Sequence, residues 1–349
     1  MPNMGNHKDI VLAQAPCRVD LAGGTVDLWP LYLFHAGAVV VNMAVNILTT
    51  CRITPLSGKQ IHLTSVDTGR EERFANFFEL CAATKFKHPL AAHLVKFFAP
   101  EGGFRMETNS ESPAGAGISG SSALMIASTA ALAKYTDREM GLEDARVLAQ
   151  NIEAQLIQVP TGCQDYYPAL YGGASAIHLD PDGIHREAIP VPLEEIDSRF
   201  VLAYTGAPRQ SGINNWEVFK MHIDGNRKVH RNFDSITAIA QAMHNALGNA
   251  GWDEVARLVR EEWKLRRTNA PGITTPYIDS LIGVALKNGG VAAKVCGAGG
   301  GGCVIFMTEE GARKRVETAL RGAKATILPF KVAREGLSVE RVAASQRGR

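Results

Sequence analysis

Short apolar runs of strand length occupy much of the first third of the chain. Residues 10–14 and 18–22 are apolar enough to be strands, and residues 38–53 are rich in Val and Ile and long enough for one or two. Residues 60–66 alternate apolar and polar side chains, which predicts a strand with one buried face. A weaker run at 104–108 predicts another strand just before a glycine-rich segment.

Apolar residues at helical spacing predict helices farther along the chain. Within 142–158 this spacing places Leu148 and Ile152 on one face, and Pro160 ends the helix. Residues 124–134 are rich in Ala and Leu without Gly or Pro, which also favours a helix. The same spacing predicts helices at 88–99, 233–247, 252–267 and 277–288.

The second half of the chain mixes these helices with strands. Apolar runs predict strands at 174–179, 200–204, 291–295 and 303–307. The turn residues 180–183, followed by Pro190 and Pro192, indicate a junction between domains. Because strands and helices are mixed rather than strictly alternating, we predict an α+β protein and not a doubly wound sheet. A length of 349 residues suggests two domains, 1–190 and 191–349.

Composition narrows the class of protein. Hydrophobic residues make up 46% and charged residues 21%, as in ordinary soluble domains, and a net charge of +2 gives no reason to expect nucleic acid or a membrane as partner. The six cysteines are scattered without a CxxC pair, which argues against a disulfide framework or a structural zinc site. Residues 1–9 are polar and no run reaches membrane-span length, so we expect a cytoplasmic protein. The basic residues 341–349 are expected to be a frayed tail.

The stretch 113–123, Pro-Ala-Gly-Ala-Gly-Ile-Ser-Gly-Ser-Ser-Ala, is the strongest candidate for chemistry. A glycine-rich loop that leads into a helix directs free N–H groups and the positive end of the helix dipole at one place, which suits phosphate. Ser121 and Ser122 could cap the helix, contact phosphate or bind Mg²⁺. A plain turn with a serine cap is the alternative. The stretch is neither a P-loop, which ends in Gly-Lys-Ser/Thr, nor a dinucleotide fingerprint.

Three charged residues stand out by their position. Asp165 follows Pro160 and Gly162 in a loop, where it could orient or deprotonate a hydroxyl or simply cap the next helix. Glu153 has apolar neighbours on its predicted helix, so it is either solvated or partly buried near a metal. Arg18 lies inside an apolar strand and needs an anion, which could be Asp20, Asp27 or a phosphate.

Three segments in order resemble motifs of the GHMP kinase superfamily, which includes galactokinase, homoserine kinase and mevalonate kinase. They are residues 16–28, residues 113–123 and residues 294–303, and the resemblance covers nearly the whole chain. In the glycine loop, Ile118 stands where the family has Leu, and one additional residue falls at 119–120. The resemblance implies an ATP-binding domain like domain 2 of ribosomal protein S5 over 1–190, followed by a ferredoxin-like domain over 191–349.

Within the superfamily, the chain is most similar to sugar-1-kinases that act on heptose 7-phosphate or fucose. The signs are Leu-Ala-Gly-Gly at 21–24, Gly-Cys-Gln-Asp at 162–165, and Tyr-Thr-Gly at 204–206. Thr25 and Val26 precede Asp27, where many heptose kinases have Gly-Thr. The resemblance implies transfer of phosphate from ATP to a hydroxyl, expected to be the anomeric one. The alternatives are a mevalonate or phosphomevalonate kinase, and a non-catalytic regulator that binds sugar and ATP.

The resemblance also implies the site residues, together with ATP and Mg²⁺ as cofactors. Asp165 and Arg18 are the expected catalytic residues, and Ser122 and Glu153 the expected Mg²⁺ ligands. The ATP phosphates are expected on Pro113, Gly115, Ala116, Gly117, Ser119, Gly120, Ser121 and Ser122. The substrate is expected on Asp27, Gly24, Gln164, Gly299, Gly300 and Arg209. The partner is a small sugar or sugar phosphate, and a homodimer is compatible with the resemblance.

Overall fold

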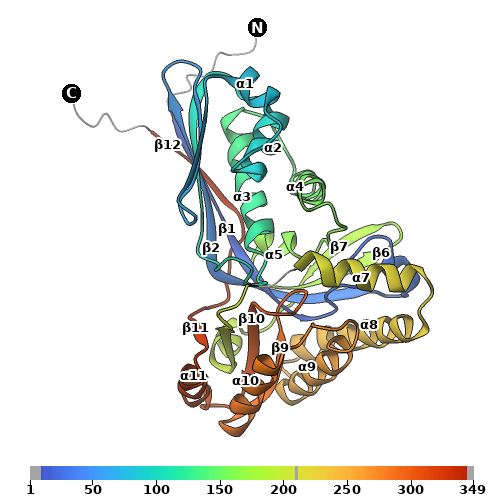
Figure 1. Cartoon of the computed structure of the whole chain (residues 1–349). Coiled ribbons are helices and arrows are strands. Elements are labelled where there is room, and N and C mark those ends of the chain that lie inside the picture. The colour runs from blue at the N-terminus through green and yellow to red at the C-terminus, as the bar shows by residue number, and fades with distance from the viewer. Residues whose placement is uncertain (1–8, 209–210, 344–349) are drawn as a thin grey trace.

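The computed structural model of the chain describes residues 9–208 and 211–343. It contains two β-sheets, each covered by helices (Figure 1). The larger sheet and helices α1–α4 form the upper part of Figure 1, and the smaller sheet with α9–α11 forms the lower part. The predicted α+β class is confirmed.

The larger sheet has eight strands in the order β12-β1-β2-β5-β3-β4, with β6 paired to β2 and β7 to β6. One continuous strand, β1, replaces the two that were predicted at 10–14 and 18–22. Pro16 lacks an N–H group, and the pairing with β2 shifts register directly after it, so the strand continues through the proline. The strands are β1 (Ile10–Ala22), β2 (Val39–Leu56), β3 (Ile61–Ser65), β4 (Arg70–Phe74), β5 (Gly103–Ser110), β6 (Ala174–Asp180), β7 (Gly183–Ala188) and β12 (Ser338–Val342).

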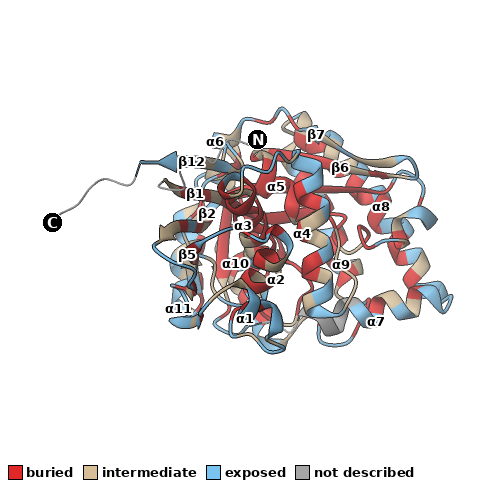
Figure 2. Cartoon of the chain, turned by 90° about the horizontal axis from the view of Figure 1, so that it is seen from above, coloured by how far each residue is buried: buried red, intermediate tan, exposed pale blue. Residues whose placement is uncertain are grey.

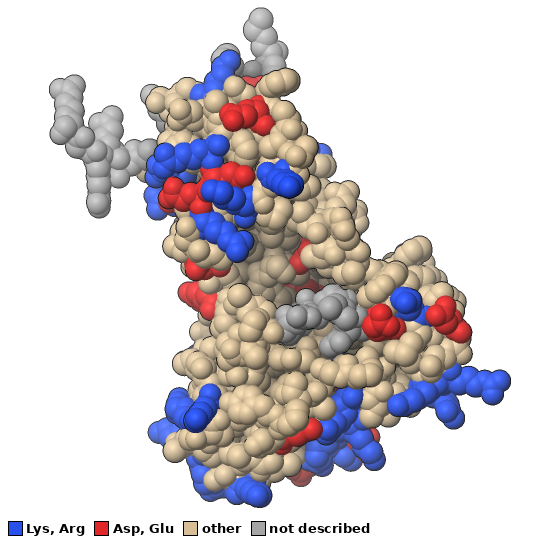
Figure 3. Space-filling model, in the orientation of Figure 1, with Lys and Arg blue, Asp and Glu red and all other residues tan. Residues whose placement is uncertain are grey.

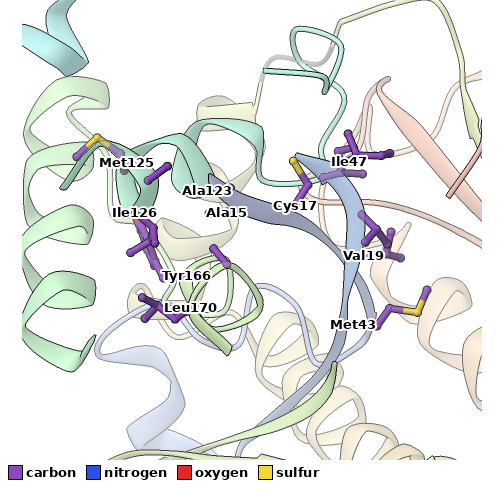
Figure 4. Packing of buried hydrophobic residues seen from close by; sticks show 14 of the residues in the cluster. Ala15, Cys17, Val19, Met43, Ile47, Ala123, Met125, Ile126, Tyr166 and Leu170 are labelled. Carbon is purple, nitrogen blue, oxygen red and sulfur yellow. The ribbon is translucent and has the colours of Figure 1, made fainter. Parts of the chain in front are cut away.

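One central helix, α3, packs against both β1 and β2. Most of its residues are buried, because it is also covered by α2, α4 and α5, and this explains why its sequence is apolar on all sides. In Figure 4, Met125 and Ile126 of α3 lie together with Tyr166 and Leu170 of α5, beside the strands. The helices of the first 190 residues are η1 (Leu31–Phe34), α1 (Phe77–Ala82), α2 (Pro89–Phe98), α3 (Gly120–Tyr135), α4 (Leu142–Ile157) and α5 (Tyr166–Tyr171).

The smaller sheet has the order β11-β8-β10-β9. Helix α8 beside it alternates red and pale blue along its length in Figure 2, as expected for an amphipathic helix with one buried face. Helix α8 begins six residues before the predicted start, because Asn226 caps it by accepting hydrogen bonds from the N–H groups of Lys228 and Val229. The elements are α6 (Leu193–Arg199), β8 (Phe200–Tyr204), α7 (Ser211–Ile223), α8 (Arg227–Gly248), α9 (Trp252–Arg266), α10 (Pro276–Lys287), β9 (Gly290–Val295), β10 (Cys303–Thr308), α11 (Arg313–Gly322) and β11 (Thr326–Leu328).

The end of the chain returns to the first sheet. Strand β12 pairs antiparallel with residues 10–14 of β1, so it lies in the larger sheet and not with the smaller one. Arg341 and Val342 are part of this strand, and the expectation that they belong to a frayed tail is wrong. The division at 190/191 remains a prediction.

The surface agrees with the modest net charge. In Figure 3, Lys and Arg side chains are interspersed with Asp and Glu over the visible face, which carries no field of a single sign. Among the described residues, no helix combines the length and apolar character that crossing a bilayer requires.

Candidate active site

A cleft of about 570 Å³ opens above the start of α3. All eight residues predicted to hold ATP phosphates line it, and so do Glu153 and Asp165. Gly115 and Gly117 have φ values of 67° and 80°, a left-handed conformation that glycine adopts without strain and that turns the loop towards the helix. Helix α3 starts at Gly120, directly after Ser119. Its N-terminus therefore faces a cleft that suits an anion.

Asp165 is held by the buried Arg18. Nε and Nη2 of Arg18 both donate to Oδ1 of Asp165, at 2.9 and 2.5 Å, and Nη1 donates to the carbonyl of Gly117 at 2.8 Å. Burial opposes the charge on Arg18, but the carboxylates of Asp165 and Asp20 outweigh it and raise the arginine pKa. Asp165 is the nearest carboxylate to Arg18, while Asp20, one of the anions considered from the sequence, lies at 4.0 Å. Oδ2 of Asp165 has no hydrogen-bond donor among the described residues, so it can accept one from a ligand in the cleft.

Glu153 is buried beside the glycine loop. Ser121 Oγ donates to its Oε1 at 2.6 Å, and the hydroxyl of Tyr166 donates to its Oε2 at 2.7 Å. Burial raises the pKa of Glu153, and the hydroxyls of Ser121, Tyr166 and Ser122 counteract that rise. A carboxylate and serine hydroxyls at the phosphate end of the cleft are hard oxygen ligands of the kind that Mg²⁺ prefers. The sequence did not indicate Tyr166 as a partner, since an aromatic residue after Asp165 is equally typical of a core position.

Asp27 lies behind Asp165 and is fully buried. The backbone N–H of Gln164 donates to its Oδ2 at 2.9 Å, and Gln164 Nε2 donates to Oδ1 at 3.3 Å. Burial raises the pKa of Asp27 to about 6. A Cβ atom at Gly162 would lie 1.9 Å from Oδ2 of Asp27, so only glycine fits there. The structure thus brings two predicted substrate residues, Asp27 and Gln164, into direct contact.

Three glycines were also predicted to bind the substrate, and like Asp27 and Gln164 they are not among the residues that line the cleft. Gly299 and Gly300 pack on Ile273, and Gly300 donates its N–H to the Ile273 carbonyl at 2.8 Å. Gly24 leaves space for the side chains of Arg266 and Asp20. None of the three glycines lines the cleft, and their role in binding remains a prediction. Arg209 lies outside the described residues.

The third motif contacts the glycine loop directly. Cys303 donates its N–H to the carbonyl of Ala116 at 2.7 Å, and a Cβ atom at Gly302 would lie 2.6 Å from the same oxygen. Gly302 must therefore be small for the two loops to meet. This contact joins the glycine-rich segments 113–123 and 294–303.

A buried ion network below the site was not predicted. Asp20 accepts hydrogen bonds from Arg266 Nη1 and from Lys294 Nζ, each at 2.8 Å. Glu262 pairs with the same two cations at 3.2 and 3.1 Å. Burial alone would raise the pKa of Asp20, but Lys294, Arg266 and Arg18 hold it well below its usual value. A lysine among apolar residues in the 291–295 run was the available signal in the sequence.

His88 marks the far end of the cleft. It is the N-cap residue of α2 and lines the cleft together with Ser65, Thr68 and Lys87. Its side chain is buried, and its Nε2 atom has no hydrogen-bond partner among the described residues. Buried polar atoms are normally paired, so a buried nitrogen without a partner is unusual, although the atom itself is closed to solvent.

Known proteins with similar sequences and folds are kinases. Residues 81–173 match the model of the GHMP kinases N terminal domain, and residues 241–325 match that of the GHMP kinases C terminal domain, together about half of the chain. A D-glycero-alpha-D-manno-heptose 7-phosphate kinase of Campylobacter jejuni is 24% identical over 95% of this chain and 99% of its own length.

Two further similar proteins are also named as sugar kinases. An L-fucokinase/L-fucose-1-P guanylyltransferase of Bacteroides fragilis is 27% identical over 88% of this chain, which spans only 36% of that longer protein. The structure of Lactococcus lactis galactokinase complexed with galactose matches 96% of this chain, with a TM-score of 0.77 at 20% identity. At that identity the likeness shows the fold, which confirms the predicted two-domain architecture.

Proposed function

Since the chain belongs to the GHMP kinase superfamily, whose members are phosphotransferases with an alcohol group as acceptor, we propose that it transfers the γ-phosphoryl group of ATP to the anomeric hydroxyl of a sugar or sugar phosphate. Heptose 7-phosphate and fucose are the first candidates, because relatives named for those substrates align over most of the chain. The observation that carries the proposal is the Arg18–Asp165 pair at the floor of a cleft whose rim is the glycine loop.

Phosphoryl transfer needs an aligned hydroxyl and stabilisation of charge more than covalent help from the protein. Asp165 accepts both Arg18 hydrogen bonds on Oδ1, which leaves Oδ2 to accept the hydrogen bond of the attacking hydroxyl. Arg18 fixes the orientation of that carboxylate. The N-terminus of α3 and the N–H groups of the loop bind the phosphates of ATP.

Members of this superfamily generally use Mg²⁺ with ATP, and the residues present fit the ion. Glu153 and the hydroxyls of Ser121 and Ser122 would hold it at the phosphate end of the cleft. When bound, it would neutralise charge on the ATP phosphates. Tyr166 fixes the Glu153 carboxylate from the other side.

The substrate class is tested by ADP release from MgATP with a panel of acceptors. The panel contains heptose 7-phosphate, fucose, galactose, glucuronate and mevalonate. We expect turnover with one sugar and none with mevalonate. Turnover with mevalonate alone would replace the sugar proposal by the mevalonate alternative.

The pH dependence of substrate binding tests the role of Asp27. A carboxylate accepts hydrogen bonds from sugar hydroxyls only on its unprotonated oxygens, and the pKa of Asp27 is raised to about 6. As the pH falls through 6, we therefore expect kcat/KM for the sugar to decline while KM for ATP stays constant. Asp27→Asn should have lower kcat/KM for the sugar and lack that inflection. An inflection near pH 6 that persists in the variant would assign it to another group.

His88 provides a test of nucleotide binding. With the phosphates at the glycine loop, we expect the nucleoside to extend along the cleft and pack against His88, one of its lining residues. Loss of that packing predicts that His88→Ala raises KM for ATP by up to about 10-fold at unchanged kcat. His93→Ala on the same helix is the control, because His93 does not line the cleft. Equal effects of both substitutions would contradict the assignment.

A further inference from the structure

Three metal-ligating side chains converge far from the cleft, between the β6–β7 hairpin and α8. His178 on β6 and Glu187 on β7 share one face of the hairpin, and His244 projects to them from α8. His178 Nε2 lies 3.1 Å from Glu187 Oε2, and His244 Nε2 lies 3.3 Å from Glu187 Oε1. Both imidazoles therefore direct their Nε2 atoms at one carboxylate.

These distances match the coordination shell of a tetrahedral ion. With bonds of 2.0–2.1 Å, neighbouring ligand atoms around Zn²⁺ are about 3.3 Å apart. Two imidazoles on such an ion have ring centres about 5 Å apart, and the rings of His178 and His244 are 5.5 Å apart at 71°. We propose that His178, Glu187 and His244 form a binding site for a divalent transition metal of the Zn²⁺ class.

A second cluster, of three histidines, lacks the geometry that a metal site requires. His35, His222 and His230 are also close together, but the rings of His222 and His230 are stacked with centres 3.9 Å apart. Parallel stacked rings cannot both direct a nitrogen lone pair at one ion. In addition, His35 and His222 already share a hydrogen bond of 2.8 Å between their Nε2 atoms. In the His178–Glu187–His244 cluster the two imidazole rings are not stacked but inclined at 71°, and each Nε2 atom contacts a carboxylate oxygen rather than another imidazole.

The proposed site is partly exposed, so a bound metal ion could exchange with solvent. The side chains of His178, Glu187 and His244 are 34%, 54% and 22% exposed, so an ion can enter from solvent and water can complete its shell. Two imidazoles and one carboxylate favour Zn²⁺, Ni²⁺ or Cu²⁺ over Mg²⁺, which prefers oxygen ligands. The two sites would therefore prefer different metal ions, because the ligands in the cleft are all oxygen atoms. The bound ion would join α8 to the edge of the larger sheet.

The three ligands could not be predicted as a site from the sequence, because His244 comes from a helix far along the chain from His178 and Glu187. A structural zinc site is recognised in a sequence by closely spaced cysteines and histidines, and the residues around His178, Glu187 and His244 lack that spacing. Strand pairing places His178 opposite His185 and thus near Glu187, and only packing of α8 adds His244.

The test is titration of the untagged full chain with Co²⁺, followed by visible absorption. We expect one equivalent to give the intense bands of a four-coordinate ion with nitrogen ligands, and Zn²⁺ to displace it and raise Tm. His178→Gln and His244→Gln should each weaken binding by at least about 10-fold. His93→Gln on α2, a histidine outside every described cluster of ligating side chains, should leave the affinity unchanged, and so should Glu153→Gln in the cleft.

Three results would overturn the proposal. They are the absence of these bands, retention of affinity in both the His178 and the His244 variants, and loss of binding in His93→Gln or Glu153→Gln instead. Glu187→Gln keeps the test valid if a histidine variant does not fold, because this side chain is more than half exposed. It should weaken Co²⁺ binding without changing the circular dichroism spectrum.

Discussion

Asp165→Asn is expected to lower kcat by roughly 10²–10⁴ while leaving the fold intact. The asparagine oxygen can still accept the hydrogen bonds from Arg18, and Asp20 remains near that arginine, so the buried cation is not left alone. What disappears is the carboxylate oxygen that accepts the hydroxyl of the substrate. The measurement is the rate of ADP release at saturating MgATP and saturating sugar.

A lower kcat identifies Asp165 as a catalytic residue only if the Asp165→Asn variant still binds MgATP. The Kd for MgATP, measured by calorimetry, should change by less than a factor of two or three, since Asp165 does not touch the phosphate loop in the present geometry. Asp144→Asn is the matched control, because Asp144 is an exposed aspartate on α4. A kcat within tenfold of the wild type would mean that Asp165 is a structural partner of Arg18 and no more.

Arg266→Met is expected to lower the free energy of unfolding by about 3–5 kcal/mol. The substitution leaves Asp20 and Glu262 buried with Lys294 as their nearest remaining cation. Loss of one partner from a buried ion network is costly because the remaining charges cannot regain water. The pKa of Asp20 is depressed in the folded state, so the stabilisation is present above the usual carboxyl pKa and is lost as the pH falls below it. Denaturant unfolding at neutral pH is the appropriate measurement.

The same helix supplies the control for this prediction. Arg257 pairs with Glu254 and Glu261 on the exposed side of α9, where solvent screens the charges. Arg257→Met should leave the unfolding midpoint within experimental error. If the two substitutions were equally mild, the network would be no more important to stability than an ordinary surface pair.

Elements with a strong apolar pattern could be predicted from the sequence. Helices α4 and α9 and strands β8 and β10 lie within a residue or so of their predicted bounds. Helix α11 was missed because its sequence, Arg-Lys-Arg-Val-Glu-Thr-Ala-Leu-Arg-Gly, buries only Val316 and Leu320. Strand β12 was missed because it is mostly exposed and gains its place only by pairing with β1.

The residues of the candidate active site could likewise be predicted only where a local sequence motif indicates them. The resemblance to the kinase family implied the glycine loop around Ser122, the Glu153 carboxylate and the Asp165 loop as site residues, and all of them line one cleft. It could not predict that Lys294 meets Asp20, because the two residues are 274 positions apart. An isolated lysine in an apolar strand indicates that a partner is needed, but only the tertiary fold shows which carboxylate supplies it.

Strand β12 also has a consequence for the synthesis of the protein. Residues 10–14 of β1 leave the ribosome long before their outer partner, residues 338–342. During translation this edge of β1 is therefore open, and an open edge strand is a template for pairing with other chains. A chain cut before residue 338 presents that edge permanently. Protection against aggregation thus depends on a short segment that contributes nothing to the cleft.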